Sequence, residues 1–171
     1  MNIAAVQQGE YNPYYQPYFD KMTNIELVTG LESDHREVLE FMDKLPADKL
    51  EYRYEVGKWT IKEILVHLLD TERVFAYRAL RFARKDSTSL AGFEQDDYIQ
   101  PSKANERSLD SLRSEFDAVR KGNIELFKNM DEEMLSQMGT ASGSPMSSRA
   151  AAFMIVGHSR HHRQIIEERY L

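Results

Sequence analysis

Apolar side chains recur three and four residues apart in four long segments of this chain of 171 residues. That spacing places them on one face of a helix, where they can form a shared core. It predicts helices over about residues 25–45, 60–84, 108–130 and 147–169. Thr60 and Glu63 have the spacing of a capping box at the second helix start, and Pro46 follows the first helix. Since no segment has a strand pattern, we expect an all-α fold, a four-helix bundle.

The segments that join the predicted helices differ in length. Residues 85–107 have no sustained period and contain Gly92 and Pro101, so we expect a long connection there. Residues 139–145 are rich in glycine and serine and predict a loop. A connection as long as 85–107 allows the second and third helices to run parallel, which makes the second and fourth antiparallel.

Residues 1–23 are aromatic and interrupted by Pro13 and Pro17. We expect an extended arm here, because proline disfavours a helix interior. The rings need cover, so the arm should pack on the bundle or on a partner subunit. Together, arm and bundle predict a single domain over residues 1–171. The aromatic residues are Tyr11, Tyr14, Tyr15, Tyr18 and Phe19.

Charge and cysteine content narrow the range of partners. Lys and Arg total 22 against 28 Asp and Glu, which disfavours nucleic acid and anionic membranes as partners. The longest apolar stretch, Ala150 to Val156, is too short to span a membrane, and we see no signal peptide at the N-terminus. The chain has no cysteine, so no thiolate of its own can bind a metal or act as a nucleophile. We expect a cytoplasmic protein.

His158 and His162 carry the clearest chemical signal. They are four residues apart, so they share one face of the fourth helix and can reach one ion. Their face is otherwise apolar, which directs both imidazoles into the bundle, where unsatisfied polar groups are costly. A pair of core or surface histidines is the alternative. The apolar members of this stripe are Ala151, Met154, Ile155, Ile165 and Ile166.

His67 can join this pair if the second and fourth helices are antiparallel. It lies roughly 10 Å below the start of the second helix, at 1.5 Å per residue. His162 and His158 lie roughly 10 and 16 Å from the end of the fourth helix. The three rings then meet at one level and predict a site for one divalent metal ion. Three protein ligands leave coordination positions open, and neutral imidazole suits Zn²⁺, Ni²⁺, Cu²⁺ or Fe²⁺.

Three other residues are candidates for roles near this site. Glu63 and His35 are candidate general bases, and the alternatives are a helix-start carboxylate and a pocket wall. Arg78 could clamp an anionic substrate, although a salt bridge to a neighbouring helix is the commoner outcome. His161 is turned roughly 100° from His162 and is not expected to be a ligand.

Several motifs of the chain resemble the DinB-like superfamily. They are the segments Gly57–Glu63, Asp70–Arg73 and Gly157–His162, together with His67. The Tyr14-Tyr15 arm and the segment Leu90–Tyr98 are similar to its larger branch. The resemblance covers nearly the whole chain. It implies an up-down-down-up four-helix bundle, often a homodimer, with a divalent metal, commonly zinc or nickel, bound by His67, His158 and His162.

The same resemblance leaves the reaction open. Many relatives are described as metal-dependent hydrolases, and others transfer groups to the sulfur of bacillithiol, mycothiol or glutathione. We therefore expect a metal-dependent hydrolase acting on a small molecule. The alternatives are a thiol S-transferase, whose low-molecular-weight thiol must come from solution, and a metal-stabilised binding protein without turnover.

Overall fold

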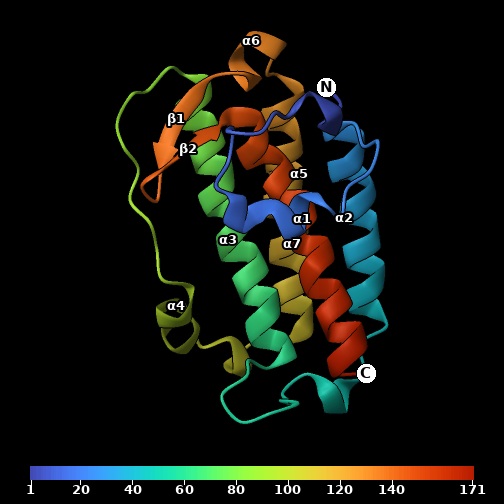
Figure 1. Ribbon diagram of the computed structural model, residues 1–171. Coiled ribbons are helices and arrows are strands. Elements are labelled where there is room, and N and C mark those ends of the chain that lie inside the picture. The colour runs from blue at the N-terminus through green and yellow to red at the C-terminus, as the bar shows by residue number, and fades with distance from the viewer.

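Four long helices lie side by side in the computed structural model, which describes residues 1–171 (Figure 1). Each begins and ends within two residues of its predicted bounds, so the predicted four-helix bundle is confirmed. The helices are α2 (Leu27–Asp43), α3 (Ile61–Ala83), α5 (Leu109–Lys128) and α7 (Ser148–Arg169). None of the helices is long and apolar enough to cross a lipid bilayer.

Hydrogen bonds at the two ends of the bundle define the helix directions. The Ser148 hydroxyl, at the start of α7, donates to the carbonyl of Ala79 near the end of α3 at 2.9 Å. The Tyr170 hydroxyl, just past the end of α7, donates to the carbonyl of Trp59 before α3 at 2.7 Å. Helices α3 and α7 are therefore antiparallel. Lys62 donates to the carbonyl of Asn105, which joins the starts of α3 and α5, so these two run parallel. The order is up-down-down-up.

Serine and threonine caps explain where the core helices begin. The Thr60 hydroxyl accepts from the Glu63 amide at 3.1 Å, and the Glu63 carboxylate accepts from the Thr60 amide at 2.7 Å. This is the predicted capping box of α3. Ser108 and Ser147 accept from backbone amides in the same way at the starts of α5 and α7. Each such cap is worth about 1 kcal/mol.

The shorter elements add detail to the predicted arm and to the predicted long connection. The N-terminal arm is not uniformly extended, because it contains the 3-10 turns η1 (Ile3–Ala5) and η2 (Pro13–Tyr15) and the short helix α1 (Gln16–Phe19). Pro13 is the first residue of η2 and Pro17 the second of α1, positions where a missing amide hydrogen costs nothing. The long connection holds α4 (Gln95–Ser102) and η4 (Ala104–Glu106). The other short elements are η3 (Ala47–Lys49) and α6 (Glu132–Leu135).

The predicted loop at residues 139–145 is wrong, because this segment is a β-hairpin. Strands β1 (Met138–Ala141) and β2 (Ser144–Ser147) pair antiparallel, with Met138 opposite Ser147. The two residues between them, Ser142 and Gly143, both have positive φ angles, of 52° and 73°. That is the backbone of a tight hairpin turn, and glycine adopts it at no steric cost.

A buried polar layer crosses the bundle between two apolar clusters. One cluster of 22 residues includes Leu31, Phe75 and Val156, and the other, of 14 residues, includes Val38, Leu69 and Ile166. Between these two clusters lie four polar side chains, one from each of α2, α3, α5 and α7: Asp34, Glu72, Arg120 and His158. All four are buried. We call these four residues the polar layer.

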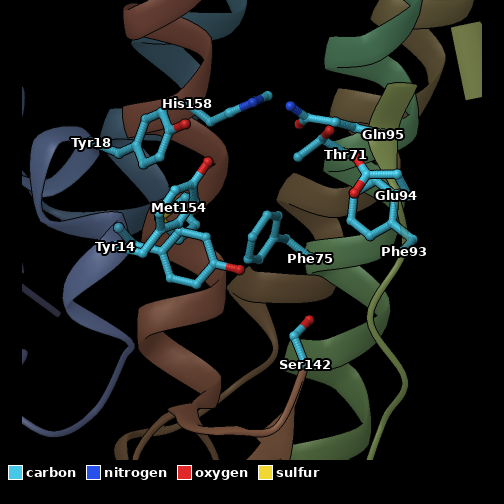
Figure 2. A pocket seen from close by; sticks show the side chains of 11 residues that line it. Tyr14, Tyr18, Thr71, Phe75, Phe93, Glu94, Gln95, Ser142, Met154 and His158 are labelled. Carbon is cyan, nitrogen blue, oxygen red and sulfur yellow. The ribbon is translucent and has the colours of Figure 1, made fainter. Parts of the chain in front are cut away.

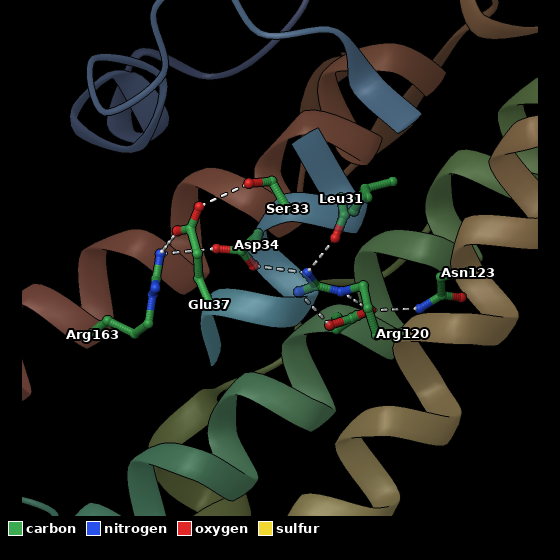
Figure 3. Close-up of polar contacts among 8 residues, drawn as sticks. Leu31, Ser33, Asp34, Glu37, Arg120, Asn123 and Arg163 are labelled. Atoms are coloured by element: carbon green, nitrogen blue, oxygen red, sulfur yellow. Dashed lines mark hydrogen bonds and ion pairs between the residues drawn. The ribbon is translucent and has the colours of Figure 1, made fainter. Parts of the chain in front are cut away.

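Ion pairs within the polar layer connect α2, α3 and α5 (Figure 3). The Arg120 guanidinium binds both carboxylate oxygens of Glu72 at 2.8 and 2.9 Å and the carboxylate of Asp34 at 2.7 Å. Asp34 also accepts from Arg163 of α7 at 3.2 Å. Burial alone would lower the pKa of Arg120, but the charges of Glu72 and Asp34 more than offset it and raise that pKa. The buried charges are thus paired, as their burial requires.

Candidate metal centre

His67 of α3 and His158 and His162 of α7 come together at one level of the bundle. One ring nitrogen from each lies within 4.8 Å of the others, and the Nε2 atoms of His67 and His158 are 3.0 Å apart. Two nitrogens bound to one zinc ion at its usual distance lie about 3.3 Å from each other. The arrangement therefore fits one metal ion, and no cysteine or carboxylate belongs to the cluster.

Burial keeps all three imidazoles neutral. It lowers the pKa of His67 to about 4. Burial also lowers the pKa of His158 and His162 well below its usual value, and the charges of the neighbouring histidines lower it further. A neutral imidazole has a free lone pair, which is the form that binds a metal.

The surroundings of the rings restrict their orientation. The Thr71 hydroxyl lies 3.4 Å from Nδ1 of His67, on the side of the ring away from the Nε2 atom that faces His158. The Trp59 ring packs 4.7 Å from His67 and stacks at 6.5 Å on His162, between centroids. Nδ1 of His162 is buried without a hydrogen-bond partner. Such an unsatisfied buried nitrogen is costly, so it points to a function for this ring.

A cleft of about 200 Å³ reaches the centre at His158 (Figure 2). We call it the first cleft. Tyr14 and Tyr18 of the arm face Phe93 and Glu94, which precede α4, across this space. The Tyr18 ring lies 5.5 Å from the His158 ring. The remaining lining residues are Tyr15, Thr71, Phe75, Gln95, Ser142 and Met154.

Gly157 allows the arm to approach α7 at this point. A Cβ atom at this position would lie 2.5 Å from the carbonyl oxygen of Tyr18, a clash with backbone. Arg160, one turn further along α7, donates to the carbonyl of Lys21 at 3.2 Å.

Burial, followed by the neighbouring Tyr14 and Tyr15, raises the pKa of Tyr18 to about 12. Its hydroxyl therefore stays protonated at neutral pH and is a hydrogen-bond donor beside the centre.

A second cleft, of about 290 Å³, reaches the centre at His162. Trp59 and Lys58 line it from the segment before α3, and Asp96 lines it from the first turn of α4. Its other lining residues are Tyr54, Gly57, Ile64, Ile165 and Tyr170. We call it the second cleft. It shares no lining residue with the first.

The other candidates from the sequence lie outside the triad. Glu63 binds Arg53 and Asn105 in addition to its capping contact. His35 bonds Asp117 of α5 at 2.9 Å. Neither has a triad histidine among its hydrogen-bond partners, and their catalytic roles stay predictions. His161 packs edge-on against Tyr18 at 5.0 Å and is not part of the cluster.

Arg78 lies behind the wall of the first cleft. It is only 2% exposed and donates to the Ser142 hydroxyl at 2.8 Å and to the carbonyl of Ala91 at 3.3 Å. Its guanidinium lies over the rings of Phe75 and Phe93. These contacts hold the connection before α4 and the hairpin turn against α3. No carboxylate pairs with Arg78, so the predicted salt bridge to a helix is not formed, and a substrate role stays a prediction.

The sequence did not identify Tyr18 and Thr71 as residues of the site. The only signal for Tyr18 was the run of uncovered aromatic residues in the arm, which predicted packing but not where. Thr71 lies four residues after His67, on the same face of α3, and that spacing could have revealed it.

Comparisons with known proteins agree with this fold. A family model described as the DinB superfamily matches residues 31–166. The chain is similar to the solved structure of YfiT from Bacillus subtilis, described as a probable metal-dependent hydrolase with an unusual four-helix bundle topology. The TM-score is 0.75 and the identity 15%, over 94% of this chain and 92% of that one.

A second solved structure, a mycothiol-dependent maleylpyruvate isomerase, is also similar. The TM-score is 0.66 and the identity 13%, over 84% of this chain and 62% of that one. Among curated proteins, none matches the sequence of this chain. At these identities the two structures establish the likeness of the fold.

Proposed function

This chain belongs to the DinB superfamily, and we propose that it is a metal-dependent hydrolase that acts on a small molecule. The observation that carries the proposal is the cluster of three neutral imidazoles beside two clefts. A structural metal site is normally closed by four protein ligands, whereas three leave room for other ligands. The clefts therefore favour an enzyme over a protein that uses metal for stability alone.

We propose zinc or nickel as the metal, held by His67, His158 and His162. Imidazole binds both ions well, and the cluster contains no carboxylate oxygen, the ligand type that magnesium and calcium prefer. Such an ion would supply a Lewis acid that polarises the bond to be cleaved.

The side chains around the triad would position the ligands and the substrate. Thr71 and Trp59 would fix the orientation of the His67 ring, as outer contacts of metal ligands commonly do. The Tyr18 hydroxyl, which is protonated at neutral pH, would donate a hydrogen bond to a substrate oxygen, because it lines the first cleft beside His158. Glu63 and His35 are the general bases predicted from the sequence, although their present hydrogen bonds suit structural roles.

A thiol-dependent S-transferase is the second candidate. Its support is the similarity of fold to a mycothiol-dependent isomerase. The absence of cysteine requires that the thiol come from solution as a small-molecule co-substrate. The predicted substrate role of Arg78, as a clamp for a carboxylate of that thiol, belongs to this candidate too, and it would require the buried guanidinium to leave its contacts with Ser142 and Ala91.

Cobalt substitution separates the two candidates. Co²⁺ bound by the triad gives a visible spectrum that changes with its ligands. A spectrum that shifts with pH near neutrality, and does not respond to bacillithiol or glutathione, supports the hydrolase. A shift on adding these thiols supports the S-transferase. If neither treatment changes the spectrum, the ion has no open position and both enzyme proposals fail.

We also propose that the protein is a homodimer, as the resemblance to the family implies. Tyr14, at 69% exposed, remains uncovered in the arm and could meet a second copy. Light scattering at micromolar concentration should give twice the mass of 19.9 kDa that one chain has. A mass of one chain would refute the dimer.

A further inference from the structure

The three histidines stand between two separate clefts. His158 lines the first cleft, His162 lines the second, and His67 lines neither. No residue is common to the two linings. Even the adjacent residues Gln95 and Asp96, at the start of α4, face different clefts. An ion among the histidines is therefore accessible from two directions that the protein keeps apart.

The two clefts also differ in charge. Glu94 is the only carboxylate that lines the first cleft, and no lysine or arginine lines it (Figure 2). The second cleft has Lys58 and Asp96 at its wall, beside the aromatic rings of Trp59 and Tyr170. Lys58 is thus the only lysine or arginine that lines either cleft, so an anion can pair with such a cation only in the second one.

We propose that the protein binds two small molecules at once, one on each side of the triad. The first cleft takes a neutral or cationic molecule, and the second takes an anionic one that carries an apolar or aromatic body. This inference rests on the proposed function in one respect, since it requires a metal ion at the triad. It goes beyond that function because a simple hydrolase needs only one organic ligand at its metal.

Blocking each cleft separately tests the proposal. The chain has no cysteine, so a single introduced thiol can be labelled with a bulky maleimide without side reactions. Glu94→Cys lies at the first cleft, at an exposed position outside the arm, and Lys58→Cys at the second. Val56→Cys is the matched control, because Val56 is 98% exposed and lines neither. The readout is the rate at which imidazole, a neutral ligand, changes the Co²⁺ spectrum. Melting temperatures and Co²⁺ content verify that each labelled protein is folded and loaded.

Two independent routes to the ion predict how far each label slows the binding of imidazole. The rates of two parallel routes add, so a label at either cleft alone should leave the part of the rate that the other cleft carries, about half of it if the routes are equal. Labels at both should slow it by at least about tenfold, and the control label should have no effect. If one label alone gives the full loss, the ion has a single entrance and the proposal is overturned. It is also overturned if the double label has no effect, or if imidazole never alters the spectrum. Failure to bind Co²⁺ at all would instead refute the proposed function.

The charge assignment has its own test. With Glu94→Cys labelled, azide has to enter through the second cleft. Lys58→Gln should then slow the binding of azide severalfold and leave the binding of imidazole unchanged. Lys44→Gln, an exposed lysine that lines neither cleft, is the control. Equal effects on azide and imidazole, or equal effects of the two lysine variants, would show that Lys58 does not select an anion.

Discussion

Replacing Arg120 by methionine should destabilise the protein severely, because it removes the one cation at the centre of the polar layer. Arg120 is fully buried and is bonded to both oxygens of Glu72 and to Asp34, which are also buried. Without the guanidinium, the buried Glu72 carboxylate has no cationic partner, and Asp34 keeps only Arg163, at 3.2 Å. Removing one partner of a buried ion pair costs about 3–5 kcal/mol, most of it from the charge left unpaired.

The unfolding of metal-free protein in urea, followed by circular dichroism, measures this loss. In a thermal scan the same loss corresponds to a fall in melting temperature of roughly 6–20 °C for a chain of this size. Arg113→Met is the matched control. Arg113 pairs with Asp43 at 2.7 Å, but both side chains are more than a third exposed, so we expect no measurable loss of stability.

A second substitution tests the physical cause. Adding Glu72→Gln to Arg120→Met removes the charge left unpaired while keeping an amide oxygen that can accept from Asn123, as Glu72 does. The double variant should be less destabilised than the sum of the two single variants, with an interaction of about 1–3 kcal/mol. The reasoning is refuted if Arg120→Met costs no more than Arg113→Met, or if the two substitutions are additive.

Two further predictions follow from the pKa of His67 and from the packing of the arm. The pKa of His67 is lowered from 6.5 to about 4. The neutral His67 ring therefore contributes fully to the stability of the metal-free protein above about pH 6.5. This contribution falls by roughly 2–3 kcal/mol on acidification to pH 4.5. Urea unfolding at several pH values checks this, and a dependence that is equally steep in His67→Gln would contradict it. Gly157→Ala should destabilise the protein by about 1–3 kcal/mol, since the added Cβ would meet the backbone of Tyr18. Gly122→Ala is the control and should be neutral or stabilising, because nothing lies within 4 Å of a Cβ at that position. Equal unfolding free energies for the two variants would contradict the close contact between arm and helix.

The main helices could be predicted from the sequence because their signals are local. Apolar spacing defines the faces of the helices, and Thr60 with Glu63 marks the start of α3. The triad was predictable for a related reason, since the rise of a helix converts positions along the chain into depths. An antiparallel pair of helices then brings His67 to the level of His158 and His162.

The remaining features depend on tertiary contacts that no local pattern encodes. The hairpin is short, and its apolar and polar residues do not alternate over enough positions to identify a strand. Glu63 and Arg78 were charged residues with several possible partners, and only the fold selects Arg53 for one and Ser142 for the other. The course of the arm was equally open, so the role of Tyr18 at the first cleft could not be anticipated.

The metal content of the purified protein tests the central claim most directly. Elemental analysis after dialysis against metal-free buffer should find about one zinc or nickel ion per chain in the unmodified protein. His67→Ala, His158→Ala and His162→Ala should each lose most of it. His161→Ala should retain the ion, because this neighbouring ring packs against Tyr18 outside the triad. Equal metal in the unmodified protein and in His158→Ala, or loss of metal in His161→Ala alone, would contradict the account.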